Sequence, residues 1–460
     1  MKNLYDEIQN FSKFKLAIIE NNKTYSYRAL HKKIDFYDKL LSLESKNKLI
    51  GIDCIININY VAAIYACFKQ KKIPIILKDK TQKGAIKKML GIKTIISDEK
   101  IINSITNNHY QEKKYNKDIS TIFFTSGTTS KYLKGVKLSH ESISHVCKYM
   151  NKRMDVNKSI IEQIYAPIDH AFAFGRMHSV LSIGGTVILP KNLIFISSII
   201  KDINKFHCNA LSTLPLILDT LLKLDNEKIN LIKENIRWIQ VGTMRLNNKD
   251  RDRVINTFSK SRIFYHYGMT EAMRTTFLEL NKEREKKYTE GKPISGVKIS
   301  ILDIKGKKQA ANKIGNIAIK GKNLFSGYIN SKENFLKRGW YLTADRGYLD
   351  EHGYLVYKGR KDDLINIKGK LLNLSELEEK ITSCFPNQKL VLIPVRQENN
   401  FLLLVVEGEE CKKTRSKIKK TLFCKNIILD KIIFINKFPR SKTMKVSRNK
   451  ILELINKNYG

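Results

Sequence analysis

Cysteine and proline are scarce in this sequence of 460 residues, which contains 7 Cys and 8 Pro. The cysteines are odd in number, are scattered from Cys54 to Cys424 and show no C-x-x-C spacing, so they indicate neither a disulfide framework nor a zinc site. No apolar run approaches the roughly 18 residues that a membrane-spanning helix requires. The start of the chain carries Asp6 and Glu7 and lacks the sustained apolar core of a secretory signal. These absences predict a cytoplasmic protein with no membrane span.

Acidic residues are also scarce, because 44 Asp and Glu face 84 Lys and Arg and leave a formal net charge of +40. An excess of this size is the electrostatic footprint of a nucleic-acid binder when it gathers on one face or segment. Here the basic residues are spread from Lys2 to Lys457 and are mostly lysine, in a chain rich in Ile and Asn, as an A/T-rich coding bias favours. No nucleic-acid-binding motif accompanies them, so we expect no nucleic-acid partner.

Short apolar runs alternate with helix-length stretches over much of the chain. Residues 49–55 and 73–77 are predicted strands on either side of a helical pattern at 60–68, and such a βαβ unit favours a parallel sheet. After Lys292 the apolar runs are separated by Gly-rich and charged turns, which is typical of antiparallel strands. The sequence therefore predicts an α/β fold, with a large layered N-terminal region of βαβ sheets and an antiparallel β subdomain at 1–358, a hinge at 359–363 and a small α+β domain at 364–460.

The most informative segment, residues 121–136, begins as a buried strand and continues into a loop dense in hydroxyl groups. This loop runs from Thr125 to the pair Lys134 and Gly135. Backbone N–H groups, hydroxyl donors and one cation in such a loop can bind a polyphosphate. It is not a Walker A loop, because the G-x-x-x-x-G-K-[ST] pattern is absent. The alternative interpretation is a flexible Ser/Thr loop.

Two further segments place a carboxylate beside a candidate nucleotide contact. In residues 265–271 an aromatic next to a glycine offers a face for a purine, and Glu271 can hold a magnesium ion between phosphate oxygens. The alternative there is a strand end followed by a helix that starts at the Thr-Glu pair. Farther along, Asp345 can accept two ribose hydroxyls and Arg360 can add a hydrogen-bonding fork, unless both belong to a salt-bridged surface turn. A basic loop at 438–448, taken alone, is a solvated cluster.

In this order, five motifs resemble the adenylate-forming superfamily: the hydroxyl loop, the segment at 265–271, the turn with Asp345, the segment with Arg360 and the basic loop at 438–448. This superfamily includes acyl-CoA and aryl-CoA synthetases, nonribosomal peptide adenylation domains and beetle luciferases. The resemblance runs from about Thr24 to Ile451. It implies an ATP-dependent acid–thiol ligase of the AMP-forming type, which makes an acyl-AMP, releases pyrophosphate and then transfers the acyl group to a thiol. The implied cofactors are ATP, Mg²⁺ and either CoA or a carrier-protein phosphopantetheine. The implied C-terminal domain is mobile.

Carried over to this sequence, the resemblance assigns roles to particular residues. The ATP phosphates are assigned to the hydroxyl loop, namely Thr125, Ser126, Gly127, Thr128, Thr129 and Lys134. The adenine and catalytic roles are assigned to Tyr267 with Gly268 for stacking, Thr270 for the α-phosphate and Glu271 for Mg²⁺. The ribose is assigned to Asp345 and Arg360, the hinge to Asp362 and the thiol tunnel to Gly369. Lys445 matches the catalytic lysine, whose ammonium would bridge the attacking carboxylate and the α-phosphate.

Several positions depart from the superfamily pattern. The phosphate loop has Ser130 where glycine is usual, lacks a proline and is one residue longer, while Ala344, Asn316 and Met444 replace residues at supporting positions. The groups that would touch ATP remain, so we expect activity to be retained. The alternatives are a catalytically degenerate nucleotide-binding protein and a stand-alone amino-acid adenylating enzyme.

The acid pocket of the superfamily begins at residues that correspond to 166–175 in this chain. His170 matches the His or aromatic of acyl- and aryl-CoA synthetases and is assigned to the catalytic set, with a satisfied core histidine as the alternative. Amino-acid-activating members carry an Asp where this chain has Ala171, and an unpaired ammonium in an apolar pocket is costly, so an amino acid is disfavoured. An apolar acid is suggested by five residues that are otherwise often core: Phe172, Phe174, Met177, Met244 and Met269.

Overall fold

The computed structural model describes residues 3–44, 46–77, 80–98, 100–103, 118–126, 133–189, 196–329, 331, 335–367, 370–385, 388–395, 401–424, 427, 429–440 and 446–459. This chain divides into two compact units, a first unit of residues 1–299 and 319–341 and a second unit of 300–318 and 342–460. The division at 359–363 that the sequence suggests stays a prediction. No helix among the described residues is long and apolar enough to cross a membrane.

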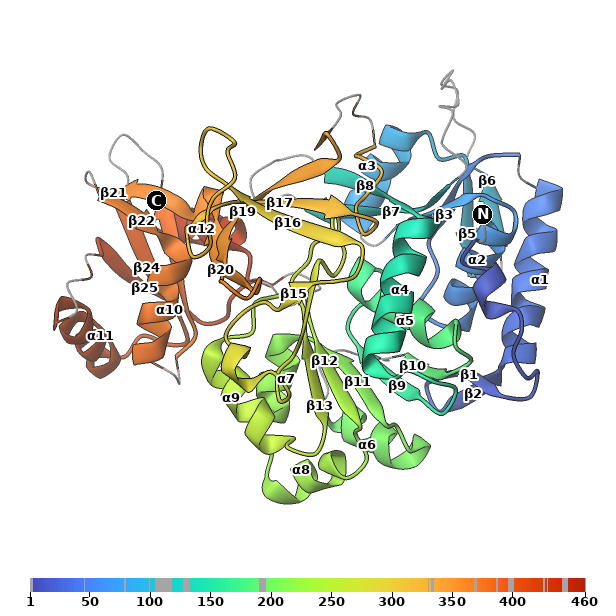
Figure 1. The fold of residues 1–460 in the computed structure, drawn as a ribbon, viewed down its shortest axis with the longest axis horizontal. Helices are drawn as coiled ribbons and strands as arrows, with labels where there is room; N and C mark the ends of the chain where they lie inside the picture. The colour runs from blue at the N-terminus through green and yellow to red at the C-terminus, as the bar shows by residue number, and fades with distance from the viewer. Residues whose placement is uncertain are drawn as a thin grey trace. The chain divides into compact units, whose positions relative to one another are not determined.

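A six-stranded sheet in the first unit has the order β6-β5-β3-β4-β7-β8 (Figure 1). Its strands are β3 (Leu49–Ile52), β4 (Ile73–Ile76), β5 (Thr94–Ser97), β6 (Lys100–Asn103), β7 (Ile119–Ser126) and β8 (Leu133–Ser139). Strands β3, β4, β5 and β7 run parallel, and every residue of β3 and β4 is buried, which is why their sequences are continuously apolar. Helix α2 (Ile58–Lys69) joins β3 to β4, so the predicted βαβ unit is confirmed. Helices α1 (Tyr27–Glu44) and α3 (Lys80–Leu90) complete this region, and α1 packs on α2.

A nine-stranded sheet in the first unit has the order β15-β14-β13-β12-β11-β9-β10-β1-β2. Its strands are β1 (Leu16–Glu20), β2 (Lys23–Ser26), β9 (Ile161–Tyr165), β10 (Thr186–Leu189), β11 (Ala210–Thr213), β12 (Trp238–Val241), β13 (Arg262–Tyr265), β14 (Thr276–Glu279) and β15 (Lys292–Pro293). The six strands from β13 to β1 in this order are parallel. Strands β14, β15 and β2 extend the sheet antiparallel at its two ends.

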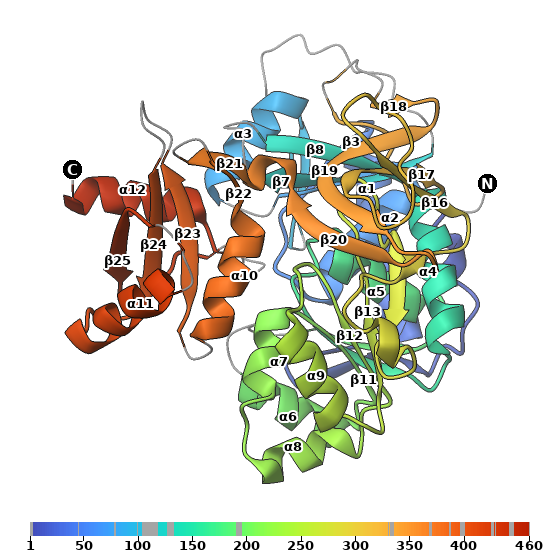
Figure 2. The same cartoon turned by 60° about the vertical axis from the view of Figure 1, so that its left-hand side comes forward.

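Helices pack on this sheet, and one of them also contacts the six-stranded sheet. Helix α5 (Ala171–Leu181) packs on β9 and β10, and α4 (His140–Met154) contacts both α5 and β8. Helix α6 (Ile196–Phe206) also packs on β9 and contacts α7 (Pro215–Leu221) and α8 (Asn226–Lys233). Helix α9 (Asn248–Thr257) lies beside α7 and α8 in both views of the ribbon (Figures 1 and 2). The predicted layered α/β body is confirmed.

The chain then forms a five-stranded sheet and a small C-terminal region. The sheet contains β16 (Val297–Leu302), β17 (Gly315–Gly321), β19 (Trp340–Leu349) and β18 (Leu336–Lys337) in that order, and β20 (Leu355–Arg360) pairs antiparallel with β19. The antiparallel subdomain that the sequence predicts is therefore confirmed. A short ladder of β21 (Leu364–Ile367) and β22 (Lys370–Asn373) follows.

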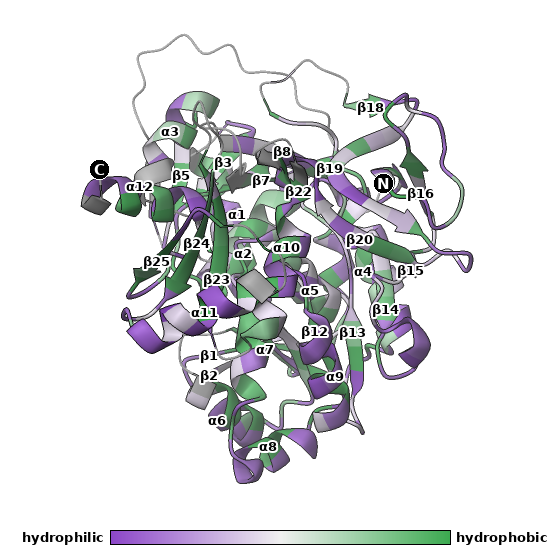
Figure 3. Cartoon of the chain, turned by 90° about the vertical axis from the view of Figure 1, so that its left-hand side faces the viewer, coloured by the Kyte–Doolittle hydropathy of each residue, from purple (hydrophilic) through white to green (hydrophobic). Residues whose placement is uncertain are grey.

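The last sheet is buried on both faces. It consists of β23 (Leu390–Val395), β24 (Phe401–Glu407) and β25 (Lys431–Ile435), flanked by α10 (Leu374–Cys384), α11 (Lys412–Cys424) and α12 (Arg448–Tyr459). Alternate residues of β24 belong to two separate apolar clusters, Leu402 and Leu404 to the one with α10 and α11, Leu403 and Val405 to the one with α12. Figure 3 shows the three strands as hydrophobic along their length. This double burial produces continuous apolar runs in a short region that also contains three helices.

Candidate active site

The carboxyl ends of four parallel strands form one edge of the nine-stranded sheet. Strands β9, β11, β12 and β13 are in register, so that their last residues, Tyr165, Thr213, Val241 and Tyr265, lie in one row. The segments that follow β9 and β13 contain His170 and residues 266–271. Ligands of open parallel sheets bind outside this edge, and two of the sequence-predicted segments leave the sheet there.

A tight turn presents Thr270 and Glu271. The backbone N–H of Met269 donates to the carbonyl of Ala272 at 3.1 Å, and the reverse hydrogen bond has the same length. Both residues at the tip of this turn are partly exposed, whereas Tyr267 before it is buried. The helix start that the sequence also allowed does not form, since the chain continues from the turn into β14.

Residues 323–329, which we name the crossing segment, join this turn to the strand that follows the hydroxyl loop. The Phe325 N–H donates to the carbonyl of Glu271 at 2.9 Å, and the Ile329 N–H donates to the carbonyl of Gly135 at 2.7 Å. The crossing segment is therefore hydrogen-bonded to both motifs through its backbone. Gly135 permits this approach, because a Cβ there would lie 2.4 Å from the Ile329 side chain.

The crossing segment brings Tyr328 between Glu271 and Lys134. The Tyr328 hydroxyl donates to Oε1 of Glu271 at 2.8 Å, and Nζ of Lys134 lies 5.6 Å from the centroid of the Tyr328 ring. Burial, followed by the neighbouring Glu271 carboxylate, raises the pKa of Tyr328, so its hydroxyl stays a hydrogen-bond donor. Sequence reasoning missed Tyr328. The two residues are 57 positions apart in the sequence, and no local sequence pattern predicts their contact.

The hydroxyl loop itself is described only at its two ends. Thr125 and Ser126 end β7, where their backbones pair with Lys134 and Leu133 of β8. Lys134, near the start of β8, is exposed. The other predicted loop residues, Gly127, Thr128 and Thr129, lie outside the described residues. The predicted thiol-tunnel Gly369 and catalytic Lys445 also lie outside them.

In the second unit the structure brings Asp345 and Arg360 together. They are direct partners across β19 and β20, and Nε of Arg360 lies 4.0 Å from Oδ1 of Asp345. The hydroxyl of Thr343 accepts from the Asp345 N–H at 3.1 Å and donates to the carbonyl of Ile317 at 2.9 Å, which fixes the backbone of the acid. Asp362, the predicted hinge residue, is exposed in the 3₁₀ turn Lys361–Asp363, and its carboxylate lies 3.9 Å from Arg360.

The segment that carries the predicted acid pocket contains both edge and core residues. His170 directly precedes α5 and is half-buried, whereas Phe172 stacks on His266 with ring centroids 5.5 Å apart and planes at 17°. Burial, followed by the charges of Arg274 and Arg176, holds the pKa of His266 well below its usual range, so this imidazole is neutral. Phe174 packs against Phe123 instead, and Met177 is fully buried, so both belong to the core.

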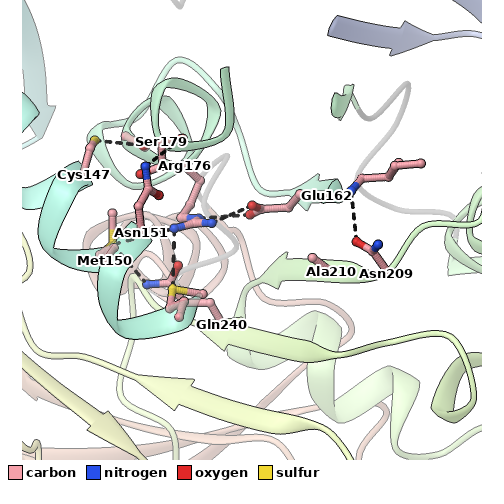
Figure 4. A network of polar contacts seen from close by, with 12 residues as sticks. Cys147, Met150, Asn151, Glu162, Arg176, Ser179, Asn209, Ala210 and Gln240 are labelled. Atoms are coloured by element: carbon pink, nitrogen blue, oxygen red, sulfur yellow. Dashed lines mark hydrogen bonds and ion pairs between the residues drawn. The ribbon is translucent and has the colours of Figure 1, made fainter. Parts of the chain in front are cut away.

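A buried ion pair fixes helix α5 to the sheet beneath it (Figure 4). Arg176 donates Nε to Oε1 of Glu162 at 3.0 Å and Nη2 to Oε2 at 2.6 Å, and both side chains are fully buried. The guanidinium also lies 5.0 Å from the ring centroid of Trp238. Bidentate geometry of this kind specifies orientation, so the start of α5 and its Phe172 are held beside the sheet edge.

Comparison with known proteins identifies the family. Residues 8–329 match the family of AMP-binding enzymes, and the chain belongs to this family. It is 29% identical over 358 residues to the oxalate–CoA ligase of Saccharomyces cerevisiae, and the matched region covers 74% of this chain and 64% of that protein. It is also 29% identical over 277 residues to the 2-succinylbenzoate–CoA ligase of Bacillus subtilis, and the matched region covers 57% of this chain and 53% of that protein. The chain thus spans less than two thirds of the length of these relatives.

Solved structures show the same fold along almost the whole chain. The o-succinylbenzoate CoA synthetase MenE of Bacillus subtilis, in complex with its acyl-adenylate intermediate, superposes with a TM-score of 0.82 at 21% identity, covering 98% of both chains. ATP-bound MatB of Rhodopseudomonas palustris superposes with a TM-score of 0.82 at 20% identity, covering 100% of this chain and 99% of that one. The predicted resemblance to the adenylate-forming superfamily is confirmed.

Proposed function

We propose that this protein is an ATP-dependent acid–thiol ligase of the AMP-forming type. In the first half-reaction a carboxylate oxygen attacks the α-phosphorus of ATP, the bond to the β-phosphate breaks, and pyrophosphate leaves. In the second, a thiol attacks the acyl carbon and AMP leaves. The observation that carries the proposal is the convergence of Lys134 and Glu271 on Tyr328, because it brings a cation that follows the hydroxyl loop near a carboxylate that follows β13 of the nine-stranded sheet.

Glu271 has the chemistry that a magnesium site on a nucleotide requires. Mg²⁺ prefers oxygen ligands and usually takes one or two carboxylates while substrate phosphates and water complete its shell. The carboxylate sits on a partly exposed turn, and Tyr328 orients it through one oxygen. Bound there, the ion would supply neutralisation of phosphate charge. We assign Thr270 to the α-phosphate and the buried Tyr267, with Gly268, to the adenine.

The remaining roles rest on the motifs that carry them. We propose that Thr125, Ser126, Gly127, Thr128 and Thr129 bind the phosphates with Lys134. Asp345 and Arg360 are proposed to bind the ribose, and their pairing across two strands supports this assignment. Lys445 is proposed as the cation of the first half-reaction, Asp362 as the pivot that withdraws it, and Gly369 as part of the thiol tunnel. His170 is proposed to line the acid pocket.

The names of the relatives favour CoA as the thiol and leave the acid open, since they range from oxalate to 4-coumarate and 2-succinylbenzoate. A carrier-protein phosphopantetheine stays a second possibility for the acceptor. A cytoplasmic location stays a prediction, because one relative is a peroxisomal OPC-8:0–CoA ligase. An amino acid remains disfavoured by Ala171.

The test is acid-dependent release of pyrophosphate from ATP, measured over fatty, aryl, short-chain, dicarboxylic and amino acids with and without CoA. The proposal predicts pyrophosphate release with at least one acid that is not an amino acid. It predicts repeated turnover only when CoA is present. A single turnover that CoA does not extend would indicate a carrier-protein acceptor. Measurable ATP binding without release for any acid would contradict the proposal and favour a degenerate nucleotide-binding protein.

A further inference from the structure

Arg274 is a buried residue in an unusual backbone conformation, two residues beyond the turn that carries Glu271. Only 3% of its surface is exposed, and its φ of 42° lies in the left-handed region that residues other than glycine seldom adopt. A long cationic side chain in such a position is unfavourable twice, through the backbone and through desolvation of the charge. Outliers of this kind are concentrated at functional sites, which makes the surroundings of Arg274 informative.

The guanidinium of Arg274 has no carboxylate partner among the described residues. Its Nη2 donates to the carbonyl of Phe172 at 2.6 Å, its charge lies 5.2 Å from the centroid of the Phe172 ring, and its Nε is buried without a hydrogen-bond partner. Burial lowers the pKa of Arg274 to about 10, so the group is still a cation at neutral pH. A buried cation held only by a carbonyl and a ring is incompletely compensated.

Two other arginines are fully buried in the part of the chain that the structure describes, and they show how such a group is normally satisfied here. Arg176 is bidentate to Glu162, and Nη2 of Arg251 lies 3.1 Å from Oε1 of Glu290. Glu162 is therefore already engaged by another guanidinium. Arg274 differs from both because no carboxylate among the described residues pairs with it, so a ligand anion is the group that would complete it.

Arg274 lies against the segment where we expect the substrate acid to bind. Its guanidinium contacts Phe172 and lies against Gly175, where a Cβ would come within 2.8 Å of Nη1. Both residues lie in the segment that contains His170, and the Phe172 ring stacks on the neutral His266. The guanidinium lies against the Phe172 ring, so we expect an anion to reach it by displacing this ring. The neutral imidazole beneath the ring adds a hydrogen-bonding group without adding charge.

We propose that Arg274 binds a second carboxylate of the substrate, so that the acid activated by this enzyme is a dicarboxylic acid. This inference rests on the proposed function, because one carboxylate must attack ATP while the other forms paired hydrogen bonds with the guanidinium. A planar guanidinium matches a carboxylate in geometry and charge, and a buried site built for an anion rejects an analogue that lacks it. The bound diacid would supply the partner that Glu162 and Glu290 supply to the other two arginines.

The test compares each diacid with its own monoamide, which keeps the shape and removes one charge. The panel is oxalate, malonate, succinate, glutarate and phthalate, assayed by pyrophosphate release with wild type, Arg274→Gln and Arg274→Lys. We expect wild type to prefer at least one diacid over its monoamide by about 100-fold in kcat/KM. Arg274→Gln should abolish this preference, because its kcat/KM should fall far more for the diacid than for the monoamide. Arg274→Lys should retain part of the preference.

A structural role for Arg274 would give a different result. Arg274→Gln removes an unpaired buried charge, so its melting temperature should equal or exceed that of wild type. A lower melting temperature together with an equal loss for every acid would overturn the proposal, as would wild type using monoamides as well as diacids. If the glutamine variant does not fold, the lysine variant decides by whether its loss is confined to diacids.

Calorimetric titration of the same diacids in the presence of ATP separates this proposal from the proposed function. Binding of a diacid to wild type that is lost in Arg274→Gln supports the site even when no acid releases pyrophosphate, and that result would contradict only the proposed activity. Turnover of monocarboxylic acids with no binding of any diacid would contradict the assignment of Arg274 while leaving the ligase intact. Absence of binding by every diacid would overturn the inference in either case.

Discussion

The hydroxyl of Tyr328 donates a hydrogen bond of 2.8 Å to Oε1 of Glu271, from a crossing segment that also bonds to the strand after the hydroxyl loop. One aromatic residue thereby sets the orientation of the proposed magnesium ligand and lies beside the cation Lys134. Because the tyrosine hydroxyl remains protonated, this contact is expected to persist throughout the physiological pH range. Removal of this hydrogen bond should change the Mg²⁺ concentration that the reaction requires more than it changes the binding of the acid.

Tyr328→Phe should lower the rate of acid-dependent pyrophosphate release by about 5-fold, the equivalent of one net hydrogen bond of about 1 kcal/mol. The concentration of Mg²⁺ required for half-maximal rate should rise, since the carboxylate loses the group that orients it. Tyr341→Phe is the matched control, because it removes a hydroxyl that lies 3.2 Å from the Tyr328 hydroxyl and leaves Tyr328 itself in place. Equal magnesium dependence in wild type and Tyr328→Phe would contradict this account.

Lys445→Ala should abolish formation of the acyl-adenylate and leave thioester formation from a supplied acyl-adenylate largely intact. The attack of a carboxylate on a phosphate brings two anions together, so only the first half-reaction needs an ammonium between them. The two half-reactions are measured separately, by pyrophosphate release and by thioester production. Equal losses in both would remove the assignment of Lys445.

Gly242→Ala should open the stack of Phe172 on His266. An added Cβ would lie 2.3 Å from Cε1 of His266 and 2.8 Å from Cε2 of Phe172, so one ring must move. Overpacking of this kind lowers the free energy of unfolding by roughly 1–3 kcal/mol, which urea denaturation measures. The KM for the acid should rise more than the KM for ATP. Gly84→Ala in α3 is the control, because nothing lies within 4 Å of its Cβ and a helical alanine should be neutral or stabilising.

Glu7→Gln should destabilise the fold at neutral pH and lose its effect in acid. Burial opposes ionisation of Glu7, but hydrogen bonds from His178, Lys148 and Ser144 outweigh it and lower the pKa of the carboxyl to about 2. A depressed carboxyl pKa contributes stability that is present above the unfolded value of about 4.3 and is lost as pH falls toward the folded value. Thermal unfolding should show a deficit of up to about 3 kcal/mol at pH 7 that narrows between pH 4 and pH 2. A deficit that stays constant with pH would contradict this linkage.

The sequence predicted the elements of the fold better than the contacts of the site. Apolar runs such as β3 and β4 are evident because both faces of a parallel strand are buried, and the motif at 265–271 is continuous in sequence. Tyr328 could not be predicted, because its relation to Glu271 depends on how the crossing segment bonds to two distant motifs. Arg274 was missed for the same reason, since only the structure shows that it is buried with no carboxylate partner among the described residues.

Some expectations rested on residue type alone, whereas packing and hydrogen bonding determine where a side chain lies and which turn or helix forms. Phe174 and Met177 have the apolar character of pocket residues, yet Phe174 packs on Phe123 and both are buried in the core. The Thr-Glu pair at 270–271 has the composition of a helix start, but reciprocal hydrogen bonds between Met269 and Ala272 close a turn instead. Periodicity cannot separate these outcomes, because the first depends on Phe123 from a distant strand and the second on backbone hydrogen bonds within the turn.

The most direct test of the central claim is exchange of labelled pyrophosphate into ATP in the absence of any thiol, with wild type and Glu271→Gln. The account predicts exchange in wild type that requires both an acid and Mg²⁺, and a reduction of about 100-fold or more in Glu271→Gln with ATP binding retained. Undiminished exchange in Glu271→Gln, or no exchange with any acid in a wild type that binds ATP, would contradict it.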